Sequence, residues 1–170
     1  AAIAMSDHIR IAGVVKESIV DGPGIRFVVF AQGCPHHCPG CHNPASHDFK
    51  GGQLVAIDSI IDEMNKNPLL DGITLSGGEP FEQAQAFAEL ARRAQAVGYH
   101  VMTYTGYSYE SLIDKKQPQQ LLEHTDLLVD GRFEVAQKSL RLKFRGSQNQ
   151  RIIDMNKSRR ENRLVLSEIG

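Results

Sequence analysis

The sequence has little of what marks secreted, membrane or nucleic-acid-binding proteins. Its 170 residues hold only three cysteines, and the net charge is -1 at pH 7. This balance provides no general attraction to nucleic acid or to an anionic membrane surface. No apolar run approaches the roughly 18 residues that cross a bilayer, and the N-terminus lacks the charged-then-apolar pattern of a signal peptide. We therefore expect a cytoplasmic protein with no nucleic-acid or membrane partner.

The sequence also lacks internal repeats, low-complexity tracts and linkers. Hydrophobic residues make up 41% and charged residues 23% of the chain, which is typical of a globular protein. The length suits one domain, which we expect to span residues 5–170. Residues 1–4, ahead of Met5, are expected to be a remnant of the expression vector.

The apolar pattern predicts strands that alternate with helices. The predicted strands are 9–15, 26–31, 72–76, 100–105 and 127–129, and the predicted helices are 57–64, 81–97, 109–113 and 119–123. Such alternation is typical of βαβ units and a parallel sheet. A closed eight-stranded barrel needs about 200 residues or more. We therefore predict an α/β fold with an open or partial (β/α) barrel of parallel strands.

Four segments rich in glycine and polar residues follow the predicted strands, at 33–47, 77–80, 103–106 and 130–132. In parallel sheets, active sites lie beyond the carboxyl ends of the strands. The four segments are therefore expected to meet at one edge of the sheet.

The cysteines lie close together, at Cys34, Cys38 and Cys41. An odd number so close in sequence makes a poor disulfide framework. Thiolates are the usual ligands of iron–sulfur clusters, and three of them leave one iron of a 4Fe–4S cluster without a protein ligand. An open iron can bind the amino and carboxylate groups of a methionine derivative, which places its sulfonium near the cluster.

Two other interpretations of the cysteines stay open at this point. His36, His37 or His42 can complete a Cys₃His zinc site, which would make the chain a zinc-stabilised interaction module without catalysis. The spacing is less usual for such a site, because zinc knuckles favour paired cysteines two residues apart. A reactive thiol with neighbouring imidazoles is the third interpretation.

The spacing Cys-x₃-Cys-x₂-Cys resembles the signature of the radical S-adenosylmethionine (SAM) superfamily. Three further motifs are similar to those of glycyl-radical enzyme activases: Asp-Gly-Pro-Gly-Ile-Arg at 21–26, Gly-Cys-Pro at 33–35 and Cys-His-Asn-Pro at 41–44. Segments 38–41, 129–133 and 145–151 most resemble activases of anaerobic ribonucleoside-triphosphate reductase. His42 instead resembles the activases of pyruvate formate-lyase.

The resemblance implies a fold of the radical SAM type and a 4Fe–4S cluster on the three cysteines. It also implies an enzyme that cleaves SAM reductively to a 5′-deoxyadenosyl radical, which abstracts hydrogen from a glycine of a partner enzyme. The implied partner is anaerobic ribonucleoside-triphosphate reductase, with a pyruvate formate-lyase-type enzyme as the alternative. The expected electron donor is a protein such as reduced flavodoxin.

The residues expected to contact SAM lie in the same segments. They are Gly40, Cys41, His42, Gly77, Gly78, Glu79, Thr103, Thr105 and Arg132. By resemblance, the segment around Glu79 holds the methionyl amino group. The two threonines can bond the ribose or the carboxylate, and Arg132 can pair with the carboxylate or the cluster. Each has a simpler alternative. The segment around Glu79 can be a strand-to-helix turn at Pro80, the threonines can be β-branched residues that suit a strand, and Arg132 can form a surface ion pair.

Overall fold

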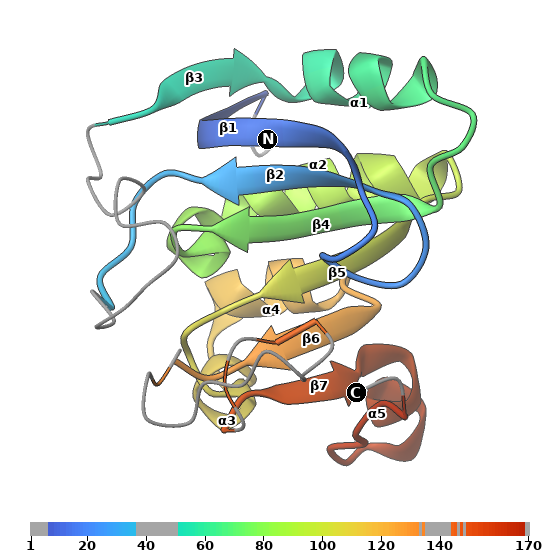
Figure 1. The fold of residues 1–170 in the computed structure, drawn as a ribbon. Coiled ribbons are helices and arrows are strands. Elements are labelled where there is room, and N and C mark those ends of the chain that lie inside the picture. The colour runs from blue at the N-terminus through green and yellow to red at the C-terminus, as the bar shows by residue number, and fades with distance from the viewer. Residues whose placement is uncertain are drawn as a thin grey trace, which may run out of the picture.

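The computed structural model describes residues 7–36, 51–132, 134, 144, 145, 147 and 149–168, which form one seven-stranded sheet with helices (Figure 1). The strands are β1 (His8–Ser18), β2 (Arg26–Ala31), β3 (Gln53–Ala56), β4 (Gly72–Gly77), β5 (His100–Tyr104), β6 (Leu127–Asp130) and β7 (Arg151–Asp154). Their order across the sheet is β3-β1-β2-β4-β5-β6-β7.

The four central strands, β2, β4, β5 and β6, run parallel to one another. The mixed α/β fold with a mostly parallel centre is therefore confirmed. The expectation that all strands are parallel is wrong at both edges, because β1 pairs antiparallel with β2 and β3, and β7 pairs antiparallel with β6. A short connection between β1 and β2 permits only a return of the chain, whereas parallel neighbours need a longer crossover.

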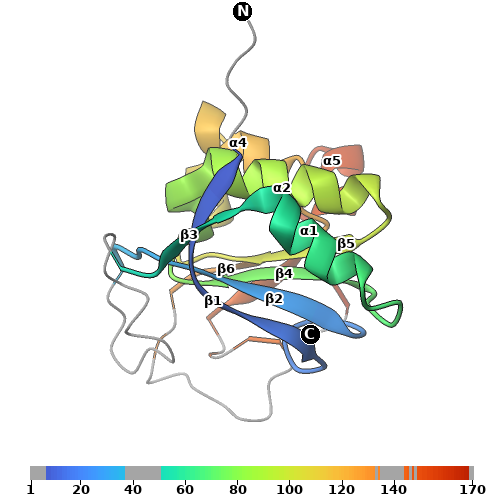
Figure 2. The same ribbon diagram turned by 90° about the horizontal axis from the view of Figure 1, so that it is seen from above.

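Helices α1, α2, α4 and α5 lie on one face of the sheet (Figure 2). The helices of the described residues are α1 (Ile57–Asn65), the 3-10 helix η2 (Pro80–Gln83), α2 (Ala84–Ala96), α3 (Tyr109–Leu112), α4 (Lys116–Leu122) and α5 (Met155–Glu161). Alternate residues of the central strands, such as Phe27, Ile73 and Val101, pack beneath the helices in the main core. Among the described residues, no helix is long and apolar enough to cross a membrane.

The opposite face of the sheet is covered by chain rather than by helices. Met102, Val129 and Ile152 form a second apolar cluster there, with Tyr104 packed against it. The connection between β1 and β2 folds over this face, where the Thr74 hydroxyl donates to the Asp21 carbonyl at 2.8 Å. The motif at 21–26 thus forms a tight turn anchored on the sheet.

The helices differ from the sequence predictions in detail. The helix predicted at 81–97 begins as the 3-10 turn η2, where the side chain of Glu79 accepts a hydrogen bond from the Phe81 N–H. Helix α4 runs through Pro118 instead of beginning after it. A proline in the first helical turn removes only an N–H group that has no partner within the helix.

Candidate functional site

The carboxyl ends of the central strands bring together the predicted loops. Cys34 follows β2, Glu79 follows β4, Thr105 follows β5, and Asp130 ends β6. Cys34 is buried, with 6% of its surface exposed. The expectation that these segments meet at one edge of the sheet is therefore confirmed for the described residues.

Two glycines bring the loop after β4 against the chain that leads into Cys34. Gly77 has a φ of 85°, which other residues rarely adopt. A Cβ atom on Gly78 would lie 2.5 Å from the Gly33 carbonyl oxygen. This close approach lets the N–H groups of Gly78 and Glu79 donate to the carbonyls of Ala31 and Gly33, each at 2.7 Å.

The Glu79 carboxylate is fully buried and receives hydrogen bonds on both oxygens. Oε1 accepts from the Gly106 N–H at 2.8 Å and lies 2.6 Å from His36 Nε2. Oε2 accepts from the Thr105 hydroxyl at 2.9 Å and from the Phe81 N–H at 3.1 Å. Four neighbouring groups, from three separate loops, therefore surround this carboxylate.

His36 sits between these loops. Its side chain is only 4% exposed, and its ring meets the edge of Tyr107 at a centroid distance of 4.6 Å and an angle of 73°. A Cβ atom on Gly106 would lie 2.4 Å from His36 Cδ2, so the absence of a side chain there makes room for the ring. The other ring nitrogen, Nδ1, is buried and has no hydrogen-bond partner in the described part of the chain. Burial and the hydrogen bond to Glu82 raise the pKa of the Tyr107 phenol above its usual value.

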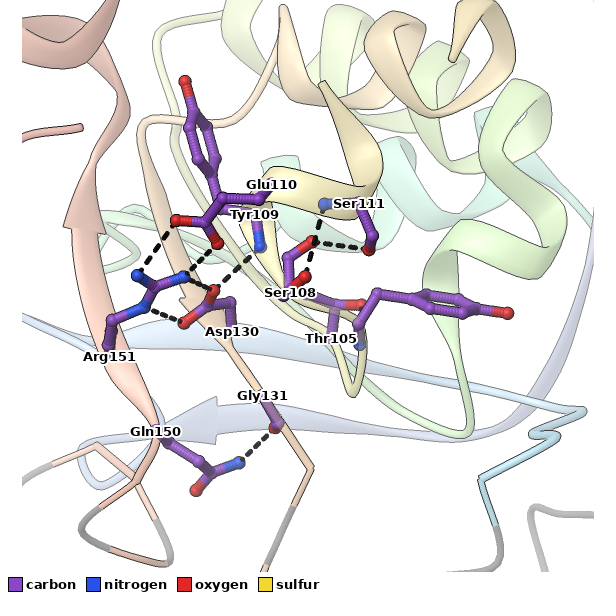
Figure 3. A network of polar contacts seen from close by, with 10 residues as sticks. Thr105, Ser108, Tyr109, Glu110, Ser111, Asp130, Gly131, Gln150 and Arg151 are labelled. Carbon is purple, nitrogen blue, oxygen red and sulfur yellow. Dashed lines mark hydrogen bonds and ion pairs between the residues drawn. The ribbon is translucent and has the colours of Figure 1, made fainter. Parts of the chain in front are cut away.

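A second polar network holds the loop after β5 from the other side (Figure 3). The buried Asp130 carboxylate accepts from the Tyr109 N–H at 2.8 Å and pairs with the Arg151 guanidinium. Arg151 also binds both oxygens of Glu110, at 2.7 and 3.2 Å, and holds the pKa of that carboxyl below its usual value. Gln150 donates to the Gly131 carbonyl at 3.1 Å. These contacts fix β7 against the end of β6.

Comparison with known proteins places this geometry in a family. The family model described as "4Fe-4S single cluster domain" matches residues 20–153. The anaerobic ribonucleoside-triphosphate reductase-activating protein of Escherichia coli K12 is 35% identical over 140 residues, covering 78% of this chain and 90% of the relative. The chain belongs to this activating-protein family. The identification as a radical SAM activase with a 4Fe–4S cluster is thereby confirmed.

Two further relatives are matched over less of their own length. The anaerobic ribonucleoside-triphosphate reductase-activating protein of enterobacteria phage T4 is 32% identical, covering 78% of this chain and 86% of the relative. The pyruvate formate-lyase-activating enzyme of Clostridium pasteurianum is 33% identical over 126 residues, covering 71% of this chain but 50% of the relative. Among solved structures, QueE from Escherichia coli reaches a TM-score of 0.46 at 13% identity, covering 58% of this chain and 52% of that one.

The described residues fit the cluster of the activating-protein family. The buried thiol of Cys34 is a soft ligand of the type that iron–sulfur clusters use, and the unpartnered Nδ1 of His36 lies in the same loop. Cys38 and Cys41 lie outside the described residues, as do Gly40 and His42. Their predicted roles as cluster ligands and cofactor contacts stay predictions.

The remaining predicted cofactor residues are placed differently from one another. Thr105 lies at the rim and bonds Glu79. Thr103 is fully buried, and its hydroxyl lies 2.9 Å from that of Thr125. Arg132 is exposed, and its carbonyl accepts from Asn149 at 2.7 Å. Their contacts with SAM stay predictions. Of the three, Thr105 has the position that best suits a contact with SAM.

Sequence reasoning did not find the roles of His36, Gly106 and Arg151. His36 was one of several histidines near the cysteines, with no signal that set it apart. Gly106 was predicted as the end of the segment 103–106 at the edge of the sheet, but its importance depends on a ring that approaches from another loop. The pairing of Arg151 with Asp130 required the return strand β7, which the sequence pattern did not reveal.

Proposed function

We propose that the chain activates an anaerobic ribonucleoside-triphosphate reductase by forming a glycyl radical on it. The single observation that carries this proposal is the extent of the match, since the chain aligns with 90% of the length of the Escherichia coli activating protein at 35% identity. The geometry supports it, because the loops after β2, β4 and β5 meet around the buried Cys34 and Glu79.

The residues have distinct tasks in this proposal. Cys34, Cys38 and Cys41 are the three protein ligands of the cluster. Gly77 and Gly78 keep the loop after β4 close to the cysteine loop. When bound, the cluster supplies the electron that cleaves SAM, and the radical so formed takes a hydrogen atom from the partner's glycine. The protein's own contribution is to place the bound groups and to exclude competing reactions.

The partial barrel and the electron donor belong to the same proposal. The barrel is supported by the position of helices α1, α2, α4 and α5, which all lie on one face of the sheet (Figure 2). A flavodoxin-type electron donor is supported by the family resemblance alone.

Anaerobic reconstitution tests the proposed chemistry. The reconstituted chain should contain iron and acid-labile sulfide, and should form 5′-deoxyadenosine from SAM after reduction. Cys34→Ala should lose this product. Ser108→Ala should retain it, because Ser108 is exposed and its side chain only caps the start of α3 by accepting from the Ser111 N–H. One tightly bound zinc ion per chain with no labile sulfide would contradict the proposal.

A glycyl-radical measurement tests the partner. The chain is incubated with reductant, SAM and either an anaerobic ribonucleotide reductase or a pyruvate formate-lyase, and the radical is read by electron paramagnetic resonance. We expect the signal with the reductase. The formate-lyase is the second candidate, because its Clostridium activase is 33% identical to this chain. A signal with the formate-lyase alone would contradict the proposed partner and would identify a formate-lyase-type enzyme as the partner.

A further inference from the structure

The segment that contains the cysteines leaves the sheet after β2 and returns to it before β3. Its departing end, residues 32–34, and its returning end, residues 51–52, both belong to the part of the chain that the structure describes. Gln32 is buried and lies two residues before Cys34. Contacts at these two ends therefore determine where the segment starts and where it finishes.

The side chain of Gln83 bonds the departing end to β1. Its Oε1 accepts from the Arg10 N–H at 2.9 Å, and its Nε2 donates to the carbonyls of Arg10 at 2.8 Å and of Gln32 at 3.2 Å. The pairing of β1 with β2 ends at Ile11 and Ala31. The amide of Gln83 therefore takes the place of a backbone partner for Arg10 just beyond the last strand pair.

The returning end meets the same part of β1. The Arg10 guanidinium donates to the Gly51 carbonyl at 3.1 Å. Gly52 has a φ of 69°, and a Cβ atom on it would overlap the Ile11 carbonyl oxygen and lie 2.9 Å from Cβ of Gln32. The Gln32 N–H in turn donates to the Arg10 carbonyl at 3.3 Å. Both ends of the cysteine segment thus contact Arg10.

Fixed ends matter for a cluster that is bound by cysteines of one segment, because the ligands move with the chain that carries them. Removing an outer contact that orients a metal ligand usually lowers metal affinity or activity by about 10–100-fold. Gln83 and Arg10 bond the main chain two residues before Cys34 and at Gly51. They are therefore placed to affect the cluster without touching it.

We infer that Gln83 and Arg10 are positioning residues for the 4Fe–4S cluster, because they join the two ends of the cysteine segment and so keep Cys34 in place. This inference rests on the proposed function, since it needs Cys34 as a ligand of the cluster. Gln83 acts on the departing end and on the main chain of Arg10. The Arg10 side chain acts on the returning end.

Substitutions at the two positions test each end separately. Gln83→Met keeps the length of the side chain but loses its hydrogen bonds to Arg10 and Gln32. Arg10→Met loses the donor to Gly51, whereas Arg10→Lys keeps a charged donor and should partly rescue the effect. Should Gln83→Met yield no folded protein, the two Arg10 variants still decide the role of the returning end.

The matched control is Gln95→Met. Gln95 is a half-buried glutamine like Gln83, and it lies on α2. Its amide bonds Asp126 at 3.4 Å and His124 at 3.1 Å, near the amino ends of the strands. This variant therefore also removes the hydrogen bonds of a glutamine side chain, but away from the cysteine segment.

The measurements are made anaerobically on the reconstituted chain without SAM. The first readout is the rate at which the iron(II) chelator bathophenanthroline removes iron, and the second is the electron paramagnetic resonance spectrum of the reduced cluster. Urea unfolding of the cluster-free proteins gives their stability separately. We expect iron release to be about tenfold faster in Gln83→Met and in Arg10→Met, with a broadened spectrum. Arg10→Lys should show a smaller increase, and Gln95→Met should match the unmodified protein.

Two outcomes would overturn the inference. Iron release as fast in Gln95→Met as in the other variants would show that Gln83 and Arg10 only stabilise the fold. An unchanged rate and spectrum in Gln83→Met and Arg10→Met would show that the cluster does not depend on these contacts. Failure of the proposed function is distinct, because the unmodified protein would then assemble no 4Fe–4S cluster.

Discussion

Arg26 and Glu79 are buried charged side chains at opposite ends of the parallel strands. Arg26 begins β2, and Glu79 follows the end of β4. Both are fully buried. In the part of the chain that the structure describes, neither forms an ion pair with a lysine, arginine, aspartate or glutamate. Each relies on hydrogen bonds to polar groups around it.

The two sites differ in what their partners belong to. Arg26 donates to the Thr74 hydroxyl at 2.7 Å, to the carbonyls of Pro23, Ile73 and His100 at 2.7–3.0 Å, and lies 3.1 Å from His100 Nδ1. Burial lowers its pKa to about 10. All these partners are scaffold groups. Glu79 instead binds His36, which lies in the cysteine loop and whose Nδ1 has no hydrogen-bond partner among the residues that the structure describes. At the amino end of the sheet, the buried charge is therefore bonded only to scaffold groups. At the carboxyl end, it is bonded to a residue of the loop that is expected to hold the ligand.

The largest expected effect is on stability, from Arg26→Met. This change leaves several buried acceptors without a donor, so we expect the free energy of unfolding to fall by about 3 kcal/mol or more. Urea unfolding measures it, with Arg26→Lys as a milder change that keeps the charge but loses the forked donors. SAM affinity of the folded protein should be unchanged. A weaker SAM complex in a fully folded Arg26→Lys protein would show that the two ends are not separate.

Glu79→Gln should affect both stability and ligand binding. The NH₂ group of the introduced glutamine would replace one carboxylate oxygen and would face a backbone N–H group, that of Gly106 or that of Phe81. Two donors would then face each other without an acceptor. We expect a loss of about 2 kcal/mol in the free energy of unfolding.

A double-variant cycle tests the connection between Glu79 and His36. The two side chains share one hydrogen bond, so the variant with both Glu79→Gln and His36→Ala should lose less stability than the sum of the two single losses. Additive losses in urea unfolding would mean that the two side chains do not stabilise each other.

The central elements followed from the sequence because their side chains are buried on both faces. Residues 26–31 were predicted as a strand and form β2, with five of six residues buried. The edge elements did not follow. The side chains of β3 are exposed or half-buried, and its four residues, Gln-Leu-Val-Ala, do not alternate between apolar and polar. Helix α5 buries only Met155 and Ser158, and its start is defined by the Asp154 side chain, which accepts from the Lys157 N–H at 2.9 Å.

The candidate site was predictable as a place but not as a set of contacts. Strand ends and glycines indicated where the loops after β2 and β4 meet, because carboxyl ends of parallel strands share one edge. The bond between His36 and Glu79 joins residues 43 positions apart. Such a pairing depends on how the loops pack, which local patterns do not encode.

Gly106→Ala should separate binding from stability at the carboxyl end. The added methyl group would overlap the His36 ring, so the ring must move. We expect the free energy of unfolding to change by about 1 kcal/mol and SAM affinity to fall several-fold, as measured by urea unfolding and equilibrium binding. Gly13→Ala is the control, because nothing lies within 4 Å of its added Cβ atom. Unchanged SAM affinity in Gly106→Ala would contradict a role for the position of His36.

The smallest expected effect is a pH dependence at the amino end. Burial and the charge of Arg26 lower the pKa of His100 below its usual value. The unfolded chain therefore binds a proton at His100 before the folded protein does, as the pH falls through the ordinary histidine pKa of about 6.5. This difference makes the folded state less stable on acidification. We expect His100 to account for a loss of less than about 1 kcal/mol between about pH 7 and 5. Urea unfolding of the unmodified protein and of His100→Gln at both pH values measures this loss. The difference in stability between the two proteins should shift in favour of the variant at the lower pH. A constant difference would show that His100 titrates alike in the folded and unfolded states.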